Sequence, residues 1–220
     1  MKYMLLFVLL GLSGMLVAQE ASAHALELAQ SGEYEEALKF YRVALDAKPK
    51  SSQNHYYKGL CEFELGKLDS AYVSFTKAIS IVRNRPDLYF YRGRTLFLLD
   101  RYEEALPDLD KAIKLDPRMG DYYLFRGRTR ISLQQIEEAH KDFSRAIETD
   151  RRIGTYYLDR GTTRLILQDT VAGCSDIKLA YEKRAFNASY WWKICQSTDQ
   201  KIKTLIPIYR PKTMLSDTLV

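Results

Sequence analysis

Small and bulky apolar residues recur along this chain at strides of 34 residues. One small column is Ala25, Gly59, Gly93, Gly127 and Gly161. Two more are Ala37, Ala71, Ala105, Ala139 and Gly173, and Ala44, Ala78, Ala112, Ala146 and Ala180. A bulky column holds Tyr41, Phe75, Leu109, Phe143 and Ile177. Four columns that stay in register over five periods, without insertion or deletion, indicate a tandem repeat.

Each period is predicted to form two helices joined by a short turn. In the second period we expect them over about 54–65 and 68–81. The turn position holds Gly32, Gly66, Asp100, Gln134 and Gln168 in successive periods. Pro49 and Pro117 are expected to stop second helices, because proline lacks an N–H and clashes with the preceding turn. Pro86 is expected to open a hairpin, where its fixed φ is tolerated.

The small columns are expected to let helix backbones approach closely. We predict that the glycine of each first helix packs against the small residue of its second helix, as the pairs Gly59–Ala71, Gly93–Ala105, Gly127–Ala139 and Gly161–Gly173. One hairpin alone buries little apolar area, so the hairpins must stack to be stable.

These spacings resemble the tetratricopeptide repeat (TPR), whose pattern is W-x2-L-G-x2-Y, then A-x3-F, then P. The middle part is matched by Ala37-x3-Tyr41, Ala71-x3-Phe75 and Ala139-x3-Phe143. The Trp position holds His55, Tyr89, Tyr123 and Tyr157, and Trp returns as Trp191. The resemblance implies an all-α, right-handed solenoid of five helix-turn-helix repeats with a C-terminal capping helix. The expected boundaries are 19–51, 52–85, 86–119, 120–153 and 154–187 for the repeats and 188–197 for the cap.

Residues 1–18 have the layout of a secretory signal peptide. Lys2 precedes an apolar run from Tyr3 to Leu12, and cleavage is expected after Ala18. The alternative is an uncleaved membrane anchor, although the sixteen residues from Tyr3 to Ala18 fall short of the roughly 20 that a spanning helix needs. We therefore expect an exported protein, periplasmic or secreted, with no stable membrane insertion after cleavage. Residues 198–220 lack the pattern and are interpreted as a tail.

Charged residues on the two helices of a period suggest ion pairs within the hairpins. The position before the column glycine holds Arg92, Arg126 and Arg160, and sixteen residues further lie Asp108, Asp142 and Asp176. A hairpin turn places both members of each pair at similar heights. The alternative is independent solvated charges.

Catalytic chemistry is not indicated. The three histidines fall in different repeats, and we find no phosphate loop, nucleophile elbow or metal motif. We predict no enzyme, no cofactor and no metal. The net charge of +5 comes from 33 basic and 28 acidic residues that are intermingled, so nucleic acid is not expected as a partner.

Two cysteines are candidates for a disulfide. Cys174 lies on the last second-type helix and Cys195 on the capping helix expected to pack against it. Cysteines on touching helices can bridge in an oxidising compartment. Two reduced, buried thiols are the alternative.

By resemblance, first helices of this family line a concave groove where ligands lie. The groove positions considered as a binding site are Tyr56, Phe63, Phe90, Arg94, Phe97, Leu124, Arg128 and Ile131. Aromatic and arginine side chains dominate binding hot spots. The alternative is that these side chains only pack between first helices. Asp87 and Asp121 are expected rivals for the two arginines.

The function predicted is a non-enzymatic scaffold that binds a protein or peptide partner in the concave groove. The alternative is a structural subunit of a cell-envelope assembly, joined through the convex face or the tail. The carboxylate clamp of one TPR subtype is absent, because the matching positions hold Ser22, Leu26, Tyr56 and Leu60.

Overall fold

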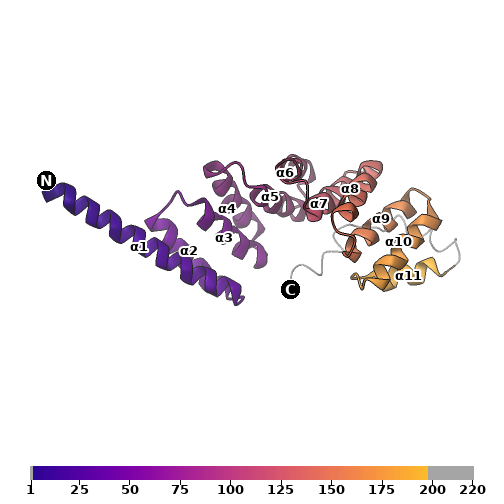
Figure 1. Cartoon of the computed structure of the whole chain (residues 1–220), viewed down its shortest axis with the longest axis horizontal. Helices are drawn as coiled ribbons and strands as arrows, with labels where there is room; N and C mark the ends of the chain where they lie inside the picture. Colours follow the sequence, from indigo (N-terminus) through magenta and orange to yellow (C-terminus); the bar gives the residue numbers. More distant parts are fainter. Residues whose placement is uncertain (1, 198–220) are drawn as a thin grey trace. The chain divides into compact units, whose positions relative to one another are not determined.

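The structure is a computed structural model that describes the backbone of residues 2–197 and the side chains of residues 14–197. Within this range the chain forms eleven helices and no strands (Figure 1). The contacts divide the chain into two compact units, 1–99 and 100–220. The expected all-α architecture of helical hairpins is confirmed.

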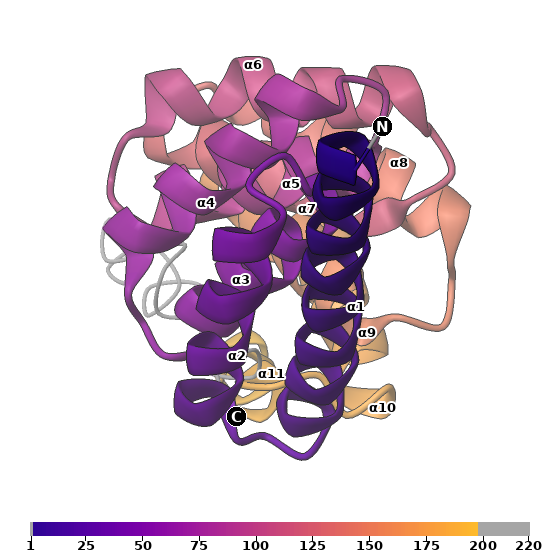
Figure 2. The ribbon, with the colours of Figure 1, turned by 90° about the vertical axis from the view of Figure 1, so that its left-hand side faces the viewer.

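The first unit contains five helices, and each packs against the next along the chain. They are α1 (Lys2–Gln30), α2 (Tyr34–Ala47), α3 (Ser52–Glu64), α4 (Leu68–Ile81) and α5 (Pro86–Leu98). First-type helices also meet each other, since α3 contacts both α1 and α5. Figure 2 shows α1 running beside α2 and α3.

The second unit contains six helices that pack in the same consecutive way. They are α6 (Tyr102–Leu115), α7 (Gly120–Ser132), α8 (Ile136–Thr149), α9 (Gly154–Ile166), α10 (Thr170–Glu182) and α11 (Ala188–Cys195). The capping helix is present as α11, which packs on α10.

The predicted turn residues all adopt the left-handed conformation. Their φ angles are +85° at Gly32, +69° at Gly66, +61° at Asp100, +60° at Gln134 and +63° at Gln168. After α3, the N–H of Lys67 bonds to the carbonyl of Glu62, and that of Gly66 bonds to Phe63. This pair of bonds satisfies carbonyls that the helix end leaves open.

The N-terminal helix α1 continues across the expected cleavage site. α1 runs from Lys2 to Gln30 without a break at Ala18, and no proline interrupts this segment. Cleavage after Ala18 remains a prediction. Among the described residues, no helix combines the length and hydropathy that crossing a membrane requires.

Aromatic rings fill the space beside the glycine column. A Cβ built on Gly59 would lie 2.8 Å from the ring of Phe75, and one on Gly127 would lie 2.5 Å from the ring of Phe143. In the fifth repeat a Cβ on Gly161 would lie 2.8 Å from the carbonyl oxygen of Gly173. The predicted backbone approach is therefore seen at Gly161, whereas the nearest atoms to Gly59 and Gly127 belong to the bulky column.

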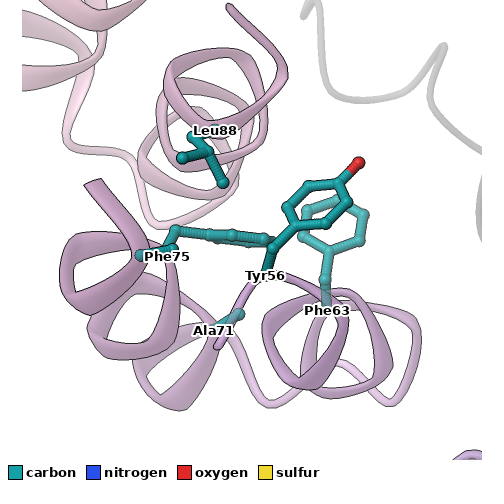
Figure 3. Close-up of a cluster of buried hydrophobic side chains, with 6 residues drawn as sticks. Tyr56, Phe63, Ala71, Phe75 and Leu88 are labelled. Carbon is teal, nitrogen blue, oxygen red and sulfur yellow. The ribbon is translucent and has the colours of Figure 1, made fainter. Parts of the chain in front are cut away.

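The core of the first unit is aromatic. Phe75 on α4 reaches toward Tyr56 on α3, with Ala71, Phe63 and Leu88 around them (Figure 3). The ring centroids of Tyr56 and Phe75 lie 6.2 Å apart, within the range of favourable aromatic pairs.

Candidate functional site

Most residues predicted to line the groove lie in the interior. The buried ones are Tyr56, Phe63, Phe90, Phe97, Leu124, Arg128 and Ile131, and Arg94 is half-buried. The ring of Tyr91 on α5 stands 5.9 Å from Tyr56 and 6.2 Å from Phe63. The aromatic side chains thus fill the space between neighbouring first helices. This burial agrees with the packing alternative, and binding of a partner at these positions stays a prediction.

The two predicted groove arginines interact with the protein itself. The guanidinium of Arg94 stacks over the ring of Phe63 at 4.7 Å. Nε of Arg128 donates to Asp159 at 2.8 Å, and both side chains are almost completely buried. An arginine in a buried pair is held by its partner, because breaking the pair would leave an uncompensated charge.

The expected rivals of these arginines have other partners. Asp87 forms an ion pair with Arg85, the residue that precedes α5. Asp121 accepts a hydrogen bond of 2.7 Å from the hydroxyl of Tyr156 on α9. The burial of Tyr156 and the adjacent Asp121 carboxylate both raise the pKa of its hydroxyl, which therefore stays a donor at neutral pH.

An open pocket is found instead between α1 and α3. Its volume is about 380 Å³, within the range of small-ligand sites. The α1 wall consists of Met15, Ala18, Gln19, Ser22, Ala23 and Leu26. The opposite wall consists of Lys48, Ser51, Gln53, Asn54 and Tyr57. We call this the first-repeat pocket.

Side-chain size explains why the space is open at this repeat. Ser22 occupies the same column as Tyr56 and Phe90, one and two periods later. The ring of Tyr56 fills the corresponding space in the second repeat, whereas the serine side chain leaves it open. Amides and hydroxyls from both helices line the walls next to Leu26 and Tyr57. The pocket therefore offers apolar surface and hydrogen-bonding groups side by side.

A charged network holds the hairpin of α7 and α8 together. Arg126 donates two hydrogen bonds to Asp142, at 3.0 and 2.6 Å, and Arg130 donates a third at 2.7 Å. Arg126 also bonds to Asp110 on α6 at 2.6 Å. The predicted ion pair is confirmed. Arg130, one turn after Arg126, was missed, although an arginine recurs at that position as Arg164.

The hairpin of α9 and α10 repeats this arrangement. Arg160 donates two bonds of 2.8 Å to Asp176, and Arg164 adds one of 2.7 Å. The predicted pair Arg160–Asp176 is confirmed. Arg92 and Asp108 fall in different compact units, so that pair stays a prediction. Within the first unit, Arg92 donates to Thr76 at 3.3 Å.

The second repeat forms a related network from other residue types. Lys58 pairs with Glu62 and donates to Ser74 at 3.0 Å, while Ser74 donates to Glu62 at 2.6 Å. These three positions correspond to Arg126, Arg130 and Asp142. In the second repeat the acidic residue, Glu62, therefore lies on the first helix of the hairpin, whereas in the fourth repeat it lies on the second helix as Asp142. The polar side chains of both networks have hydrogen-bond partners.

Cys174 and Cys195 form a disulfide between α10 and α11, with their Cα atoms 5.5 Å apart. This separation lies within the usual range for a bridge. Cys61 is a free, buried cysteine, and burial raises the pKa of its thiol to about 11.

The histidines have structural partners. Nε2 of His55 donates to the carbonyl of Pro49 at 2.9 Å, in the loop before α3. Tyr89 and Tyr123, which share the column of His55, donate to the carbonyls of Arg83 and Pro117 in the same way. Among the described residues, no group of three or more His, Cys, Asp or Glu side chains is arranged to hold a metal ion.

Comparisons with known proteins agree with this geometry. Two family models, both described as tetratricopeptide repeat, match residues 22–87 and 86–119. Residues 22–119 of this chain therefore consist of tetratricopeptide repeats, and their family models support a tetratricopeptide-repeat protein. No curated protein matches the chain significantly.

Solved structures share the fold at low sequence identity. MamA 41-end from Desulfovibrio magneticus RS-1 is 19% identical with a TM-score of 0.72, and the match covers 76% of this chain and 95% of that chain. A crystal structure of MamA protein is 20% identical with a TM-score of 0.70, covering 79% and 95%. YrrB, described as "a TPR protein with an unusual peptide-binding site", is 22% identical with a TM-score of 0.67, covering 79% and 90%. At these identities the likeness concerns the fold.

Proposed function

We propose that this protein is a non-enzymatic scaffold that captures a peptide segment of a partner in the first-repeat pocket. The TPR fold itself is typical of protein-interaction scaffolds. The observation that carries the finer proposal is the 380 Å³ opening between α1 and α3, on the side where first-type helices face one another. The peptide-binding site described for YrrB adds support from a protein of the same fold.

The pocket offers two kinds of contact. Leu26 and Tyr57 present apolar surface, while Gln19, Gln53 and Asn54 present amides. Amide side chains can both donate to and accept from a peptide backbone. Ser22 already donates to the carbonyl of Ala18 at 2.6 Å, so its place in the site is as a small residue rather than a free donor.

Export is part of the proposal. It rests on the signal-like residues 1–18 and is supported by the disulfide, because disulfides persist in oxidising compartments. Nine of the eleven lining residues follow Ala18, so cleavage there would leave most of the pocket wall in place.

Filling the pocket tests the proposal. Ser22→Tyr places in the first repeat the residue that the second repeat holds as Tyr56. We expect this variant to keep the circular dichroism and melting temperature of the wild type and to lose at least about tenfold in affinity for the partner, since a filled pocket excludes it. Partners would be identified by affinity purification and mass spectrometry, and affinity would then be measured with the isolated partner.

Ser175→Tyr, an equal substitution at an exposed position of α10, serves as the control. Unchanged affinity in Ser22→Tyr would refute the pocket as the working site.

A further inference from the structure

A second groove lies on the second-type helices of the first unit. It runs between α2 and α4 over the start of α3 and has a volume of about 840 Å³. Its lining residues are Arg42, Leu45, Asp46, Pro49, Lys50, His55, Lys58, Val73, Ser74, Lys77, Ser80 and Ile81. None of these residues lines the first-repeat pocket, so the two are separate sites.

The groove carries an excess of positive charge. Four cations line it, Arg42, Lys50, Lys58 and Lys77, against the single carboxylate of Asp46. Lys58 is neutralised by the buried Glu62. Within residues 14–197, no ion pair engages Arg42, Lys50 or Lys77. These three charges are therefore available to an anionic ligand.

Apolar surface alternates with these cations. Val73 is 49% exposed and Ile81 38% exposed, and Leu45 and Pro49 continue the same lining. Exposed apolar surface rimmed by polar residues marks interaction sites. A phosphate or a nucleic-acid backbone would contact the cations only, and the apolar side chains of the groove would stay exposed to water. A peptide with acidic and apolar side chains would satisfy both.

We propose that the α2–α4 groove binds an acidic peptide segment of a partner, with carboxylates on Arg42, Lys50 and Lys77 and an apolar side chain on Val73 and Ile81. The site is independent of the first-repeat pocket. It would let one TPR unit hold two segments at once, and linked segments bind more tightly than either alone because the second contact is intramolecular.

The test is a binding titration of the full chain with a fluorescein-labelled peptide of alternating glutamate and leucine, followed by anisotropy. The double variant Arg42→Glu/Lys77→Glu should bind roughly tenfold more weakly, because two attractive contacts become repulsive. Lys114→Glu/Lys141→Glu changes the net charge equally at exposed positions of α6 and α8 and should bind like the wild type. Equal weakening in both doubles would overturn the proposal, since binding would then follow net charge alone.

A second pair of variants, one in the groove and one control, tests the apolar contact. Val73→Thr should weaken the peptide about threefold through loss of buried methyl surface, while Val171→Thr, at an exposed valine of α10, should not. A peptide with serine in place of leucine should bind the wild type more weakly. Equal binding of the serine peptide, or complete displacement by a single-stranded oligonucleotide of the same charge, would refute an amphipathic peptide site. Ser22→Tyr should leave this binding unchanged, so failure here is distinguishable from failure of the proposed function.

Discussion

His140 shows how a single side chain links stability to pH. It lies half-buried on α8, and Nε of Arg164 donates to its Nε2 at 3.3 Å, which requires a neutral imidazole. Burial lowers the pKa of His140 below its ordinary 6.5, and the charge of Arg164 lowers it further. The unfolded chain therefore binds a proton more readily than the folded chain, and protonation favours unfolding.

We expect the contribution of His140 to stability to be present above its unfolded pKa of 6.5 and to be lost as the pH falls from there through the lower pKa of the folded state. In His140→Gln an amide accepts from Arg164 without titrating. The melting temperature of the wild type should therefore fall relative to that of this variant between about pH 7.5 and about pH 5.5. Calorimetry at several pH values gives this difference. Parallel curves for the two proteins would contradict the assignment.

At the scale of helices, breaking a network inside a hairpin is expected to destabilise the protein more than breaking a surface ion pair. Asp142 is almost completely buried and accepts from both Arg126 and Arg130. On the same helix, Arg145 and Glu148 form an exposed pair at 2.6 Å, with side chains 67% and 58% exposed. Asp142 and the exposed pair lie on the same helix and differ in burial, which makes them a matched comparison.

Asp142→Ala should lower the free energy of unfolding by about 2–4 kcal/mol, because two arginines lose a buried partner. Arg145→Ala should cost less than about 1 kcal/mol. Urea denaturation measures both. The triple variant Arg126→Lys/Arg130→Glu/Asp142→Ser copies the second repeat and should recover much of the loss. Equal costs for the two single variants would show that burial does not set the strength of the network.

The disulfide between Cys174 and Cys195 holds the last described helix, α11, against α10. α11 has eight residues and packs on α10, and the bond closes a segment with a sequence separation of 21. A loop of this size is worth about 3 kcal/mol in the chain-entropy model. Cys174→Ala/Cys195→Ala should therefore raise hydrogen exchange in α11 and leave α1–α5 unchanged. Cys61→Ala is the control for removing a buried thiol, and undiminished protection of α11 in the double variant would argue against the bridge as its anchor.

At the scale of the whole chain, repetition made much of the fold predictable. The hairpins are local, and each helix packs mainly on its neighbour in sequence. A constant stride therefore aligns small, bulky and turn positions in every repeat. Gln134 and Gln168 could be placed at left-handed turns because they share the column of Gly32 and Gly66, although glutamine alone gives no such indication.

The repeat pattern also predicted contacts between the two helices of one hairpin. Arg126 and Asp142, like Arg160 and Asp176, lie sixteen residues apart across one turn, and hairpin geometry puts them at the same height. The pairing of Cys174 with Cys195 was likewise expected from adjacent helices, although the sequence left reduced thiols as the alternative.

Contacts between repeats, and the exposure of each face, depended on the packed structure. The 34-residue spacing indicates which residues lie on the groove side of a helix. Whether those residues are exposed to solvent depends on the size of the neighbouring side chains. The ring of Tyr56 fills that side in the second repeat, and Ser22 leaves it open in the first. Arg128 donates a hydrogen bond to Asp159, which lies 31 residues away on another hairpin. The residue spacing within one repeat does not indicate this contact. The periodic pattern specifies local geometry, whereas burial is a property of the stacked repeats together.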